Sequence, residues 1–312
     1  MDYSEPVLIE VAEMYFKQGL SQKIIAKQLN VSCPTISRMI RKIRESGIVE
    51  ITIHRPETNN TRLLELAENV AAKLKLREVM VVPQSSIGLL HKNMGKLCAE
   101  WLSGKLRGKT ILGMAGGRSI AAMTDFAEKV HYPTEIVSLM GGINSVNYNI
   151  HSDMVVWNVS KQIGAASHII HSPAILADKK DAAAMKKNPV VSQVLSLFNK
   201  IDLAIVGIGT LNTGDSLLLQ SDLLSGEEIG FLKRGEYIGE MCGRFFNRGG
   251  RELAGAIAER TVAITLKQLR KIPLVCLMAS GPEKAEGIRI AARAGFFNVL
   301  ITSEETARIL LE

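Results

Sequence analysis

Basic and hydroxyl side chains are concentrated between Ser21 and Arg44, in the stretch SQKIIAKQLNVSCPTISRMIRKIR. No acidic residue interrupts this stretch, so its charge suits the phosphates of a nucleic acid. Apolar residues, among them Ile24, Ile25 and Ile36, recur at helical spacing on both sides of Asn30-Val31-Ser32, which predicts two helices joined by a turn. We therefore predict a helix-turn-helix whose second helix enters the major groove of DNA. Taken alone, the pattern also fits an ordinary basic helical hairpin.

The start of the second predicted helix is the part that would contact base edges. We assign this role to Thr35, Ser37 and Arg38, with Cys33 as a further candidate. Ser32 belongs to the same DNA-binding set, and its hydroxyl can cap the helix. The phosphate contacts are assigned to four basic residues of the two helices, Lys23, Lys27, Arg41 and Lys42.

Glycine-rich turns follow three predicted strands in the rest of the chain. Ala115-Gly116-Gly117-Arg118-Ser119 follows a strand and opens a helix, whose first backbone amides attract an anion. Arg118 adds a positive charge and Ser119 a hydroxyl. Gly141-Gly142 and Gly207-Ile208-Gly209 are similar, and each alone is more often only a turn. Their repetition predicts an anion site beyond the carboxyl ends of the strands.

Two charged residues complete this candidate site. Glu240 lies among small residues, where its carboxylate could accept hydrogen bonds from sugar hydroxyls. Lys284 begins a predicted helix, where its charge opposes the helix dipole, and a bound phosphate would account for it. An ordinary salt bridge or a solvated surface is the alternative for both residues. The sequence lacks G-x-G-x-x-G and G-x-x-x-x-G-K-[ST], so neither standard nucleotide site is expected.

The remaining metal-binding and nucleophilic residue types form no recognisable site. His151, His168 and His171 have no carboxylate-rich or H-x-x-x-H neighbourhood, so we interpret them as pocket or core residues. The four cysteines are far apart in the sequence and form no C-x-x-C pair, so we expect neither a disulfide nor a structural zinc. We therefore predict no metal, no cofactor and no catalytic residue set.

The hydrophobic pattern divides the chain into three parts, and these must position the candidate residues. Residues 1–57 form the helix-turn-helix domain, with a supporting helix over 5–17 and alternation over 48–53 that suggests a winged variant. Residues 58–76 form a helical linker, which either packs on its own body or pairs as a short dimer seam. Residues 77–312 alternate strands and helices, which predicts a mainly parallel α/β domain. Strands are expected at 79–82, 110–114, 135–140, 203–206, 274–278 and 299–302, and helices at 88–102, 118–130, 283–293 and from Glu304.

Composition agrees with a folded protein of two domains. The net charge is +7, 46% of residues are hydrophobic, and the mean hydropathy is +0.13. No apolar run reaches the ~18 residues of a membrane span. The first ten residues lack the basic start and apolar core of a signal peptide, so we expect a cytoplasmic location and no membrane partner.

Over nearly its whole length the chain resembles the SorC/DeoR-type sugar-binding transcriptional regulators. The resemblance rests on the helix-turn-helix and on several stretches of the larger domain: GMAGGRS at 113–119, LMGG at 139–142, VGIG at 206–209, GEMCGRFF at 239–246, LKQLRKIP at 266–273, EKA at 283–285 and NVLITSEETA at 298–307. It implies an effector domain related to phosphosugar isomerases and CoA transferases, which binds a phosphorylated sugar or similar metabolite. It also implies a homotetramer, as a dimer of dimers, on operator DNA with repeated half-sites.

The family pattern also implies roles for single residues. Gly116, Gly117, Arg118 and Ser119 match the phosphate region, Glu240 matches an acidic position that contacts the sugar, and Lys284 matches a lysine that contacts the effector. The chain departs from the pattern where Gly116 stands for the usual Trp, Ser119 for Thr, Glu240 for Asp and Ser280 for Gly. The implied function is regulation of a carbohydrate-metabolism operon. The alternative is a phosphosugar isomerase-like enzyme with a DNA-binding appendage, in which Glu240 would be the only good candidate for the base.

Overall fold

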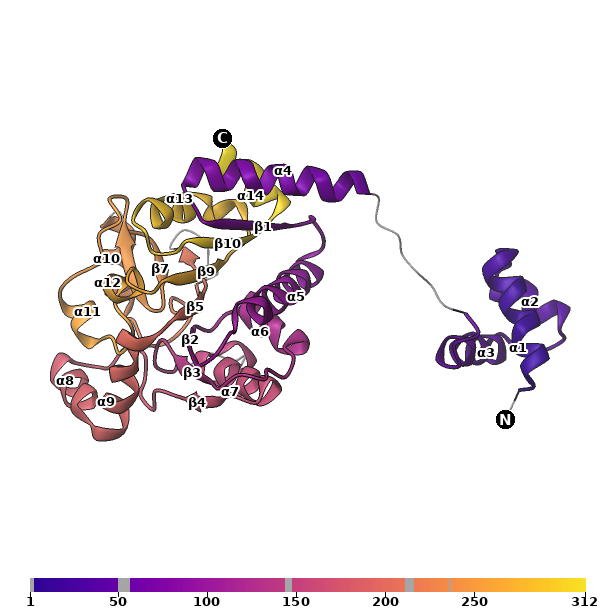
Figure 1. The fold of residues 1–312 in the computed structure, drawn as a ribbon, viewed down its shortest axis with the longest axis horizontal. Coiled ribbons are helices and arrows are strands. Elements are labelled where there is room, and N and C mark those ends of the chain that lie inside the picture. The colour runs from indigo at the N-terminus through magenta and orange to yellow at the C-terminus, as the bar shows by residue number, and fades with distance from the viewer. Residues whose placement is uncertain (1–2, 50–56, 144–147, 211–215, 236) are drawn as a thin grey trace. The chain divides into compact units, whose positions relative to one another are not determined.

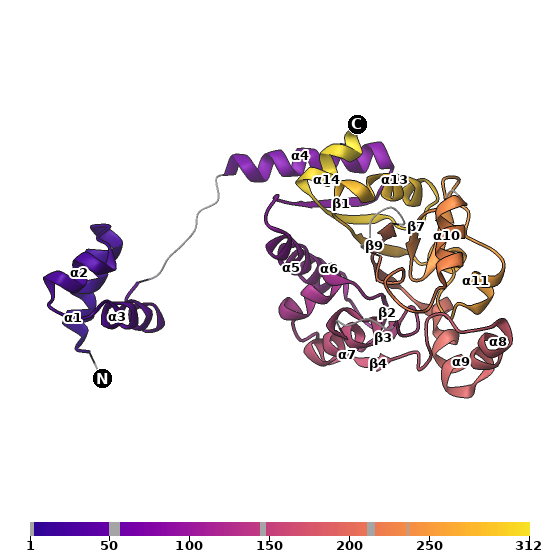
Figure 2. The same cartoon turned by 180° about the vertical axis from the view of Figure 1, so that it is seen from behind.

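A computed structural model of the chain describes residues 3–49, 57–143, 148–210, 216–235 and 237–312. The chain divides into two compact units, Met1–Glu57 and Thr58–Glu312, and each is described by itself. Figure 1 and Figure 2 show the helices of the first unit and the sheet with its surrounding helices in the second.

The first unit is a bundle of helices around a small apolar core. Helix α1 (Glu5–Ala12) continues as the π-helical segment η1 (Glu13–Lys17), and α2 (Gln22–Gln28) and α3 (Cys33–Glu45) follow. The predicted first helix and the two helices of the helix-turn-helix are therefore confirmed. The core is made by buried residues of all three α-helices, Leu8, Val11, Ala12, Ile25, Ala26, Ile36, Met39, Ile40 and Ile43.

Capping by serine fixes where α2 and α3 begin. The Ser21 hydroxyl accepts the Ile24 N–H at 3.4 Å, and the Ser32 hydroxyl accepts the Thr35 N–H at 3.3 Å. Each helix thus begins after a serine N-cap, as the sequence analysis predicted for Ser32. Asn30 adopts the left-handed conformation expected in the turn between the helices, with φ of 52°. The helical spacing of the sequence did not separate Ile24 from Ile25: in the structure Ile25 and Ala26 face the core, and Ile24 is 47% exposed.

The strand expected over 48–53 is not formed in the part of it that the structure describes. Ile48 and Val49 lie in a bend after α3 and pack their side chains against the helical core. Residues 50–56 lie outside the described residues, so the winged variant stays a prediction.

The second unit is built on a seven-stranded sheet in the order β1-β10-β9-β5-β2-β3-β4, in which neighbouring strands are parallel. This arrangement confirms the predicted mainly parallel α/β fold. A small antiparallel sheet, β6-β7-β8, stands beside it. The strands are β1 (Glu78–Val82), β2 (Thr110–Met114), β3 (Thr134–Ser138), β4 (Ala166–His168), β5 (Leu203–Val206), β6 (Gly209–Thr210), β7 (Tyr237–Met241), β8 (Arg244–Asn247), β9 (Leu274–Met278) and β10 (Val299–Ser303).

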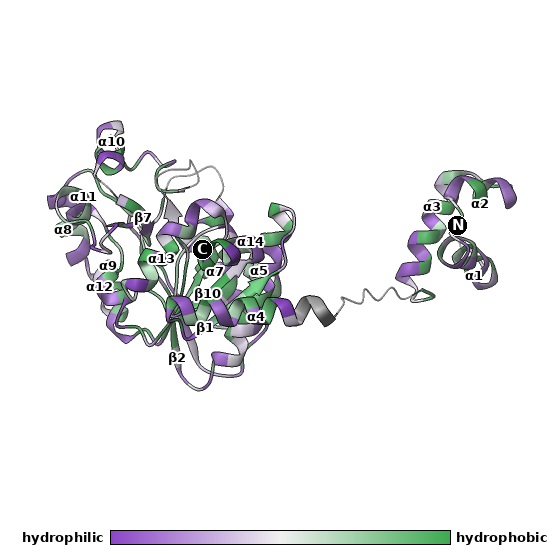
Figure 3. Cartoon of the chain, turned by 90° about the horizontal axis from the view of Figure 1, so that it is seen from above, coloured by the Kyte–Doolittle hydropathy of each residue, from purple (hydrophilic) through white to green (hydrophobic). Residues whose placement is uncertain are grey.

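Helices surround the large sheet, and their exposed faces are the more hydrophilic ones (Figure 3). The α-helices are α4 (Glu57–Leu74), α5 (Ile87–Lys105), α6 (Arg118–Ala121), α7 (Ser152–Ile163), α8 (Lys179–Lys187), α9 (Pro189–Ser196), α10 (Gly226–Arg234), α11 (Ala256–Arg260), α12 (Leu266–Leu269), α13 (Ala285–Arg293) and α14 (Glu304–Leu311). Short 3₁₀ segments are η2 (Ala122–Phe126), η3 (Tyr148–Ile150), η4 (Leu197–Lys200) and η5 (Pro282–Lys284). The helix expected over 118–130 is wrong at its end, since α6 tightens into η2 and the backbone becomes extended at Ala127.

The predicted linker helix, α4, packs on its own body. Leu66 and Val70 are buried in the core of the second unit, and Arg62 pairs with Glu304 of α14. Figure 1 and Figure 2 both show α4 running along α14. A dimer seam on this helix stays a prediction. None of the helices in the described ranges has the length and apolar character that crossing a membrane requires.

Candidate functional site

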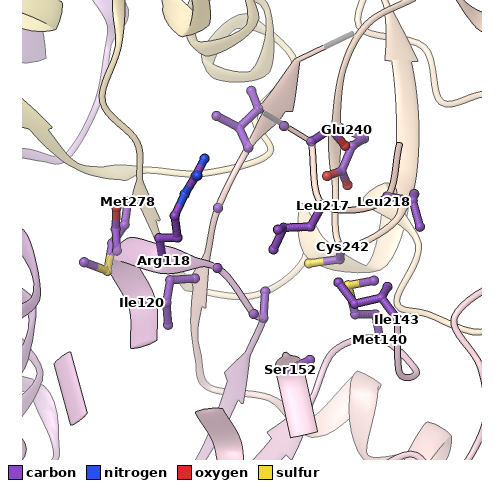
Figure 4. Close-up of a pocket in the computed structure, with 18 of the residues that line it drawn as sticks. Arg118, Ile120, Met140, Ile143, Ser152, Leu217, Leu218, Glu240, Cys242 and Met278 are labelled. Atoms are coloured by element: carbon purple, nitrogen blue, oxygen red, sulfur yellow. The ribbon is translucent and has the colours of Figure 1, made fainter. Parts of the chain in front are cut away.

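A cavity in the second unit collects most of the residues that the sequence singled out. It is bordered by the turns after β2, β3 and β5 and by β7 of the small sheet (Figure 4). Its volume is about 110 Å³, and one water molecule needs roughly 10–15 Å³ of such volume. The cavity therefore suits a small metabolite rather than a peptide.

All the predicted effector residues except Gly142 line this cavity: Gly116, Gly117, Arg118, Ser119, Gly141, Gly207, Gly209, Glu240 and Lys284. The Gly142 backbone is engaged elsewhere, because its N–H donates to the Ser172 carbonyl at 2.8 Å. The parallel sheet explains why residues so distant in sequence meet, since the carboxyl ends of its strands share one edge. The predicted site is thus one place in the fold, and its ligand contacts stay a prediction.

The turn after β2 is packed too closely for larger side chains. A Cβ on Gly116 would lie 2.6 Å from the Ile150 carbonyl oxygen. The Gly117 N–H donates to the same oxygen at 2.8 Å. This gives a steric reason for glycine where the family commonly has Trp. Because the Gly117 amide is occupied, an anion here would depend on the residues that follow, Arg118 and Ser119, which both line the cavity.

Glu240, the penultimate residue of β7, presents the carboxylate of the site. One carboxylate oxygen, Oε2, accepts the Gly243 N–H at 2.9 Å across the turn between β7 and β8. Burial raises the pKa of this carboxyl, while the Gly243 hydrogen bond and the positive charge of Lys284 act in the opposite direction. The site therefore holds a desolvated acid within the electrostatic reach of a lysine.

Lys284 stands far from Arg118 in the sequence and lines the same cavity. It ends η5 and immediately precedes α13, and its N–H donates to the Gly281 carbonyl at 3.1 Å. Its position before the helix is as the sequence predicted. Two cationic side chains and one acid around a small cavity can bind a ligand that carries an anionic group and hydroxyls.

Sequence reasoning missed most of the apolar lining of the cavity. Cys242 was seen in a motif but given no role, and it lines the cavity with φ of 52°. Burial raises the pKa of its thiol, which is therefore neutral at physiological pH. The other residues that were missed are His91, Ala115, Ile120, Met140, Ile143, Ser152, Ile208, Ser216, Leu217, Leu218 and Met278. Hydrophobic spacing alone could not distinguish the apolar members of this set from core residues.

The first unit carries the second candidate surface, on α2 and α3. Ser37, Arg38 and Arg41 are exposed on α3, opposite its buried face. Ser32 and Cys33 are exposed at the start of this helix, and Lys23 and Lys27 are exposed on α2, whereas Thr35 and Lys42 are half-buried. The Thr35 hydroxyl lies 2.8 Å from the Ser32 hydroxyl, so both take part in the cap of α3. The remaining basic and hydroxyl groups form an exposed cationic surface suited to DNA.

These two units define a class: one chain joins a helix-turn-helix to an α/β domain with a small-molecule cavity. Residues 58–312 match the family described as "Putative sugar-binding domain". The chain belongs to this family, and the resemblance to SorC/DeoR-type regulators is confirmed.

Transcriptional regulators of other bacteria are similar to this chain over almost its whole length. The deoxyribonucleoside regulator of Bacillus subtilis (strain 168) is 26% identical over 304 residues, which are 97% of this chain and 96% of that protein. The sorbitol operon regulator of Klebsiella pneumoniae is 27% identical over 313 residues, 98% of each protein. The crystal structure of full-length SorC from Klebsiella pneumoniae has a TM-score of 0.75 and 26% identity, covering 98% of this chain and 99% of that one. These names are those of transcriptional regulators and lend no support to the enzyme alternative.

Proposed function

We propose that the protein is a DNA-binding transcriptional regulator of a carbohydrate-metabolism operon. In this proposal the cavity of the second unit binds a phosphorylated sugar or a related metabolite. The observation that carries the proposal is that Arg118, Lys284 and Glu240 line one small cavity. The two cations suit a phosphate, and the acid suits the hydroxyls of the sugar.

Operator binding is assigned to the first unit. The exposed basic and hydroxyl side chains of α2 and α3 support this, because a recognition helix needs side chains that reach base edges and phosphates. The protein acts in the cytoplasm as a homo-oligomer, a dimer of dimers, on repeated half-sites. The effector binds one arrangement of the oligomer better than another and so shifts the spacing of the DNA-binding units. The named relatives regulate sorbitol and deoxyribonucleoside functions, which supports a carbohydrate effector.

A thermal-shift panel on the full-length chain tests the effector class. The ligands are sugar phosphates, the corresponding free sugars and inorganic phosphate. A saturable rise in melting temperature with a phosphorylated sugar, larger than with the free sugar, supports the proposal. No shift with any sugar phosphate would overturn this effector class. Conversion of a sugar phosphate by the protein would instead favour the isomerase alternative.

A further inference from the structure

Gly209 and Glu240 lie directly opposite each other on the neighbouring strands β6 and β7. A Cβ on Gly209 would be 2.5 Å from Oε1 of Glu240 and 3.2 Å from its Cδ. The Glu240 carboxylate therefore occupies the space that any larger residue at 209 would need. Gly209 is not among the glycines with positive φ, so the requirement for glycine here is one of space and not of backbone conformation.

A second contact holds the same carboxylate from the other side. Oε2 of Glu240 accepts the Gly243 N–H at 2.9 Å, while Oε1 lies over Gly209. The carboxylate is thus held between β6 and the turn that joins β7 to β8. Figure 4 shows it at the edge of the cavity, near Leu217 and Cys242.

Arg118 and Lys284 provide the cations that line the cavity, and Glu240 provides its acid. Figure 4 shows Arg118 and Glu240 on different sides of the cavity, while Lys284 acts electrostatically on Glu240. We call the Arg118 side the cationic end: a ligand whose phosphate binds there and whose hydroxyl binds Glu240 must have the two groups at a matching separation. We propose that Gly209 and Glu240 act as one specificity element: the missing side chain at 209 holds the carboxylate at the cavity wall, and its position sets how many carbons a bound sugar phosphate can have. This rests on the proposed function of the cavity.

Two substitutions move the carboxylate in different ways. Gly209→Ala pushes away the far end of a flexible side chain, which leaves the fold intact but breaks the Glu240–Gly243 hydrogen bond. Glu240→Asp withdraws the carboxylate towards β7 by one methylene and removes the 2.5 Å contact, although its Cγ keeps the place of the Glu240 Cγ, 3.2 Å from a Cβ at 209. The methyl group that Gly209→Ala introduces then has more room, so the double variant should regain part of what Gly209→Ala alone loses.

Isothermal titration calorimetry on the full-length wild type and the three variants tests the proposal. The ligands are erythrose 4-phosphate, ribose 5-phosphate, fructose 6-phosphate and inorganic phosphate. We expect Gly209→Ala to lower the affinity for the sugar phosphate that binds the wild type most tightly by about 10- to 100-fold, a range typical of a misplaced contact. Inorganic phosphate should bind as in the wild type, because it needs only the cationic end. Glu240→Asp should move the preference to a sugar phosphate with one more carbon, by about tenfold.

The double variant decides whether the two residues act together. We expect it to bind sugar phosphates more tightly than Gly209→Ala does, with the preference of Glu240→Asp. Additive losses, or wild-type binding by Gly209→Ala, would overturn the proposal. Gly104→Ala controls for a general effect of replacing glycine, because a Cβ on Gly104, in α5, meets nothing within 4 Å.

Thermal unfolding of the same four proteins separates this inference from the proposed function. Gly209→Ala should lower the melting temperature when position 240 carries glutamate and should lower it less when position 240 carries aspartate, because only the 3.2 Å contact to Cγ then remains. If no sugar phosphate binds the wild type, the proposed effector class fails. The melting temperatures of the four proteins then still show whether the residue at 209 and the side chain at 240 compete for the same space. Equal losses in the two backgrounds would overturn this inference.

Discussion

The guanidinium of Arg244 donates a hydrogen bond to the Ala263 carbonyl at 3.0 Å, although the side chain is only 7% exposed. It also donates to the carbonyls of Ala258 at 3.0 Å, Thr261 at 3.3 Å and Ile264 at 3.3 Å. The segment that accepts these bonds in turn pairs with the turn after β3, since the Gly141 N–H donates to the Val262 carbonyl. Arg244, the first residue of β8, therefore connects the β7–β8 hairpin to the segment that pairs with the turn after β3.

Replacing Arg244 should destabilise the second unit strongly. Arg244→Met leaves several buried carbonyls and the nearby Glu252 carboxylate without their donor, for an expected loss of about 3–5 kcal/mol in the free energy of unfolding. Urea unfolding followed by circular dichroism measures the loss. Arg251→Met, at an exposed arginine of the same region, should change stability by less than about 0.5 kcal/mol. Equal stability of the two variants would show that the buried hydrogen bonds contribute little.

Glu240 should make the second unit less stable as pH rises. Burial raises the pKa of its carboxyl above the usual 4.5. Below pH 4.5 the group is protonated in both states and has no effect. Above it, the unfolded chain ionises first, so the free energy of unfolding falls until the pH passes the folded pKa. Glu240→Gln cannot ionise, so its melting temperature should rise relative to the wild type between pH 4 and pH 7.

Glu304→Gln provides the matched control with the opposite sign. The hydrogen bond from Arg308 lowers the pKa of Glu304, with a further contribution from Arg62, so this acid stabilises the fold above its unfolded pKa and loses that effect as pH falls. The melting temperature of Glu304→Gln should therefore fall relative to that of the wild type as pH rises. A pH-independent difference for Glu240→Gln would contradict the burial argument.

A substitution in one unit should impair the binding activity of that unit and leave the activity of the other unit unchanged. Arg38→Ala removes an exposed cation of α3 and should weaken operator binding by about 10-fold or more, as one base contact is worth roughly 1–3 kcal/mol. The thermal shift with a sugar phosphate should be unchanged. Lys284→Ala should lose that shift and keep the affinity of the ligand-free protein for the operator. Fluorescence anisotropy with operator DNA and thermal shift measure the two activities. Damage to both activities by both variants would contradict the division of roles.

The sequence predicted the parts of the fold that repeat a pattern. Serine caps, glycine-rich turns and alternating strands and helices placed α3, β2, β5 and the cavity glycines correctly. Helical spacing did not show which of Ile24 and Ile25 is buried, because two adjacent isoleucines fit one helical face almost equally well. Packing in the core of the first unit decides for Ile25. Leu217 and Met278 could not be assigned to the cavity, since apolar residues in a loop or at a strand end look like core until distant elements meet.

Some site features depend on close approaches that spacing does not reveal. Gly116 and Gly209 were expected to lie in glycine-rich turns whose backbone approaches an anionic ligand. The structure gives each of them a different neighbour, the Ile150 carbonyl and the Glu240 carboxylate. Both contacts join segments far apart in the chain, so only the folded arrangement shows why glycine is required.

Thr306 of α14 should control the turn that precedes Lys284. Its hydroxyl accepts the Gly281 N–H at 2.8 Å and lies 2.9 Å from the Ser303 hydroxyl, and the residue is fully buried. Thr306→Val keeps the shape but leaves the Gly281 N–H without this acceptor, for an expected loss of about 1–3 kcal/mol in stability. Because this turn leads into Lys284, sugar phosphate binding should weaken as well, at temperatures where the variant is fully folded.

Thr306→Ser separates the hydrogen bond from the packing. It retains the hydroxyl and loses only a methyl group, so it should bind sugar phosphates like the wild type despite a cost of about 1 kcal/mol for the lost packing. Calorimetric titration and urea unfolding of both variants measure the two effects. If Thr306→Val binds as well as Thr306→Ser, the Gly281–Thr306 hydrogen bond stabilises α14 without positioning Lys284. Weaker binding by the valine variant alone makes this buried hydroxyl part of the support that positions Lys284.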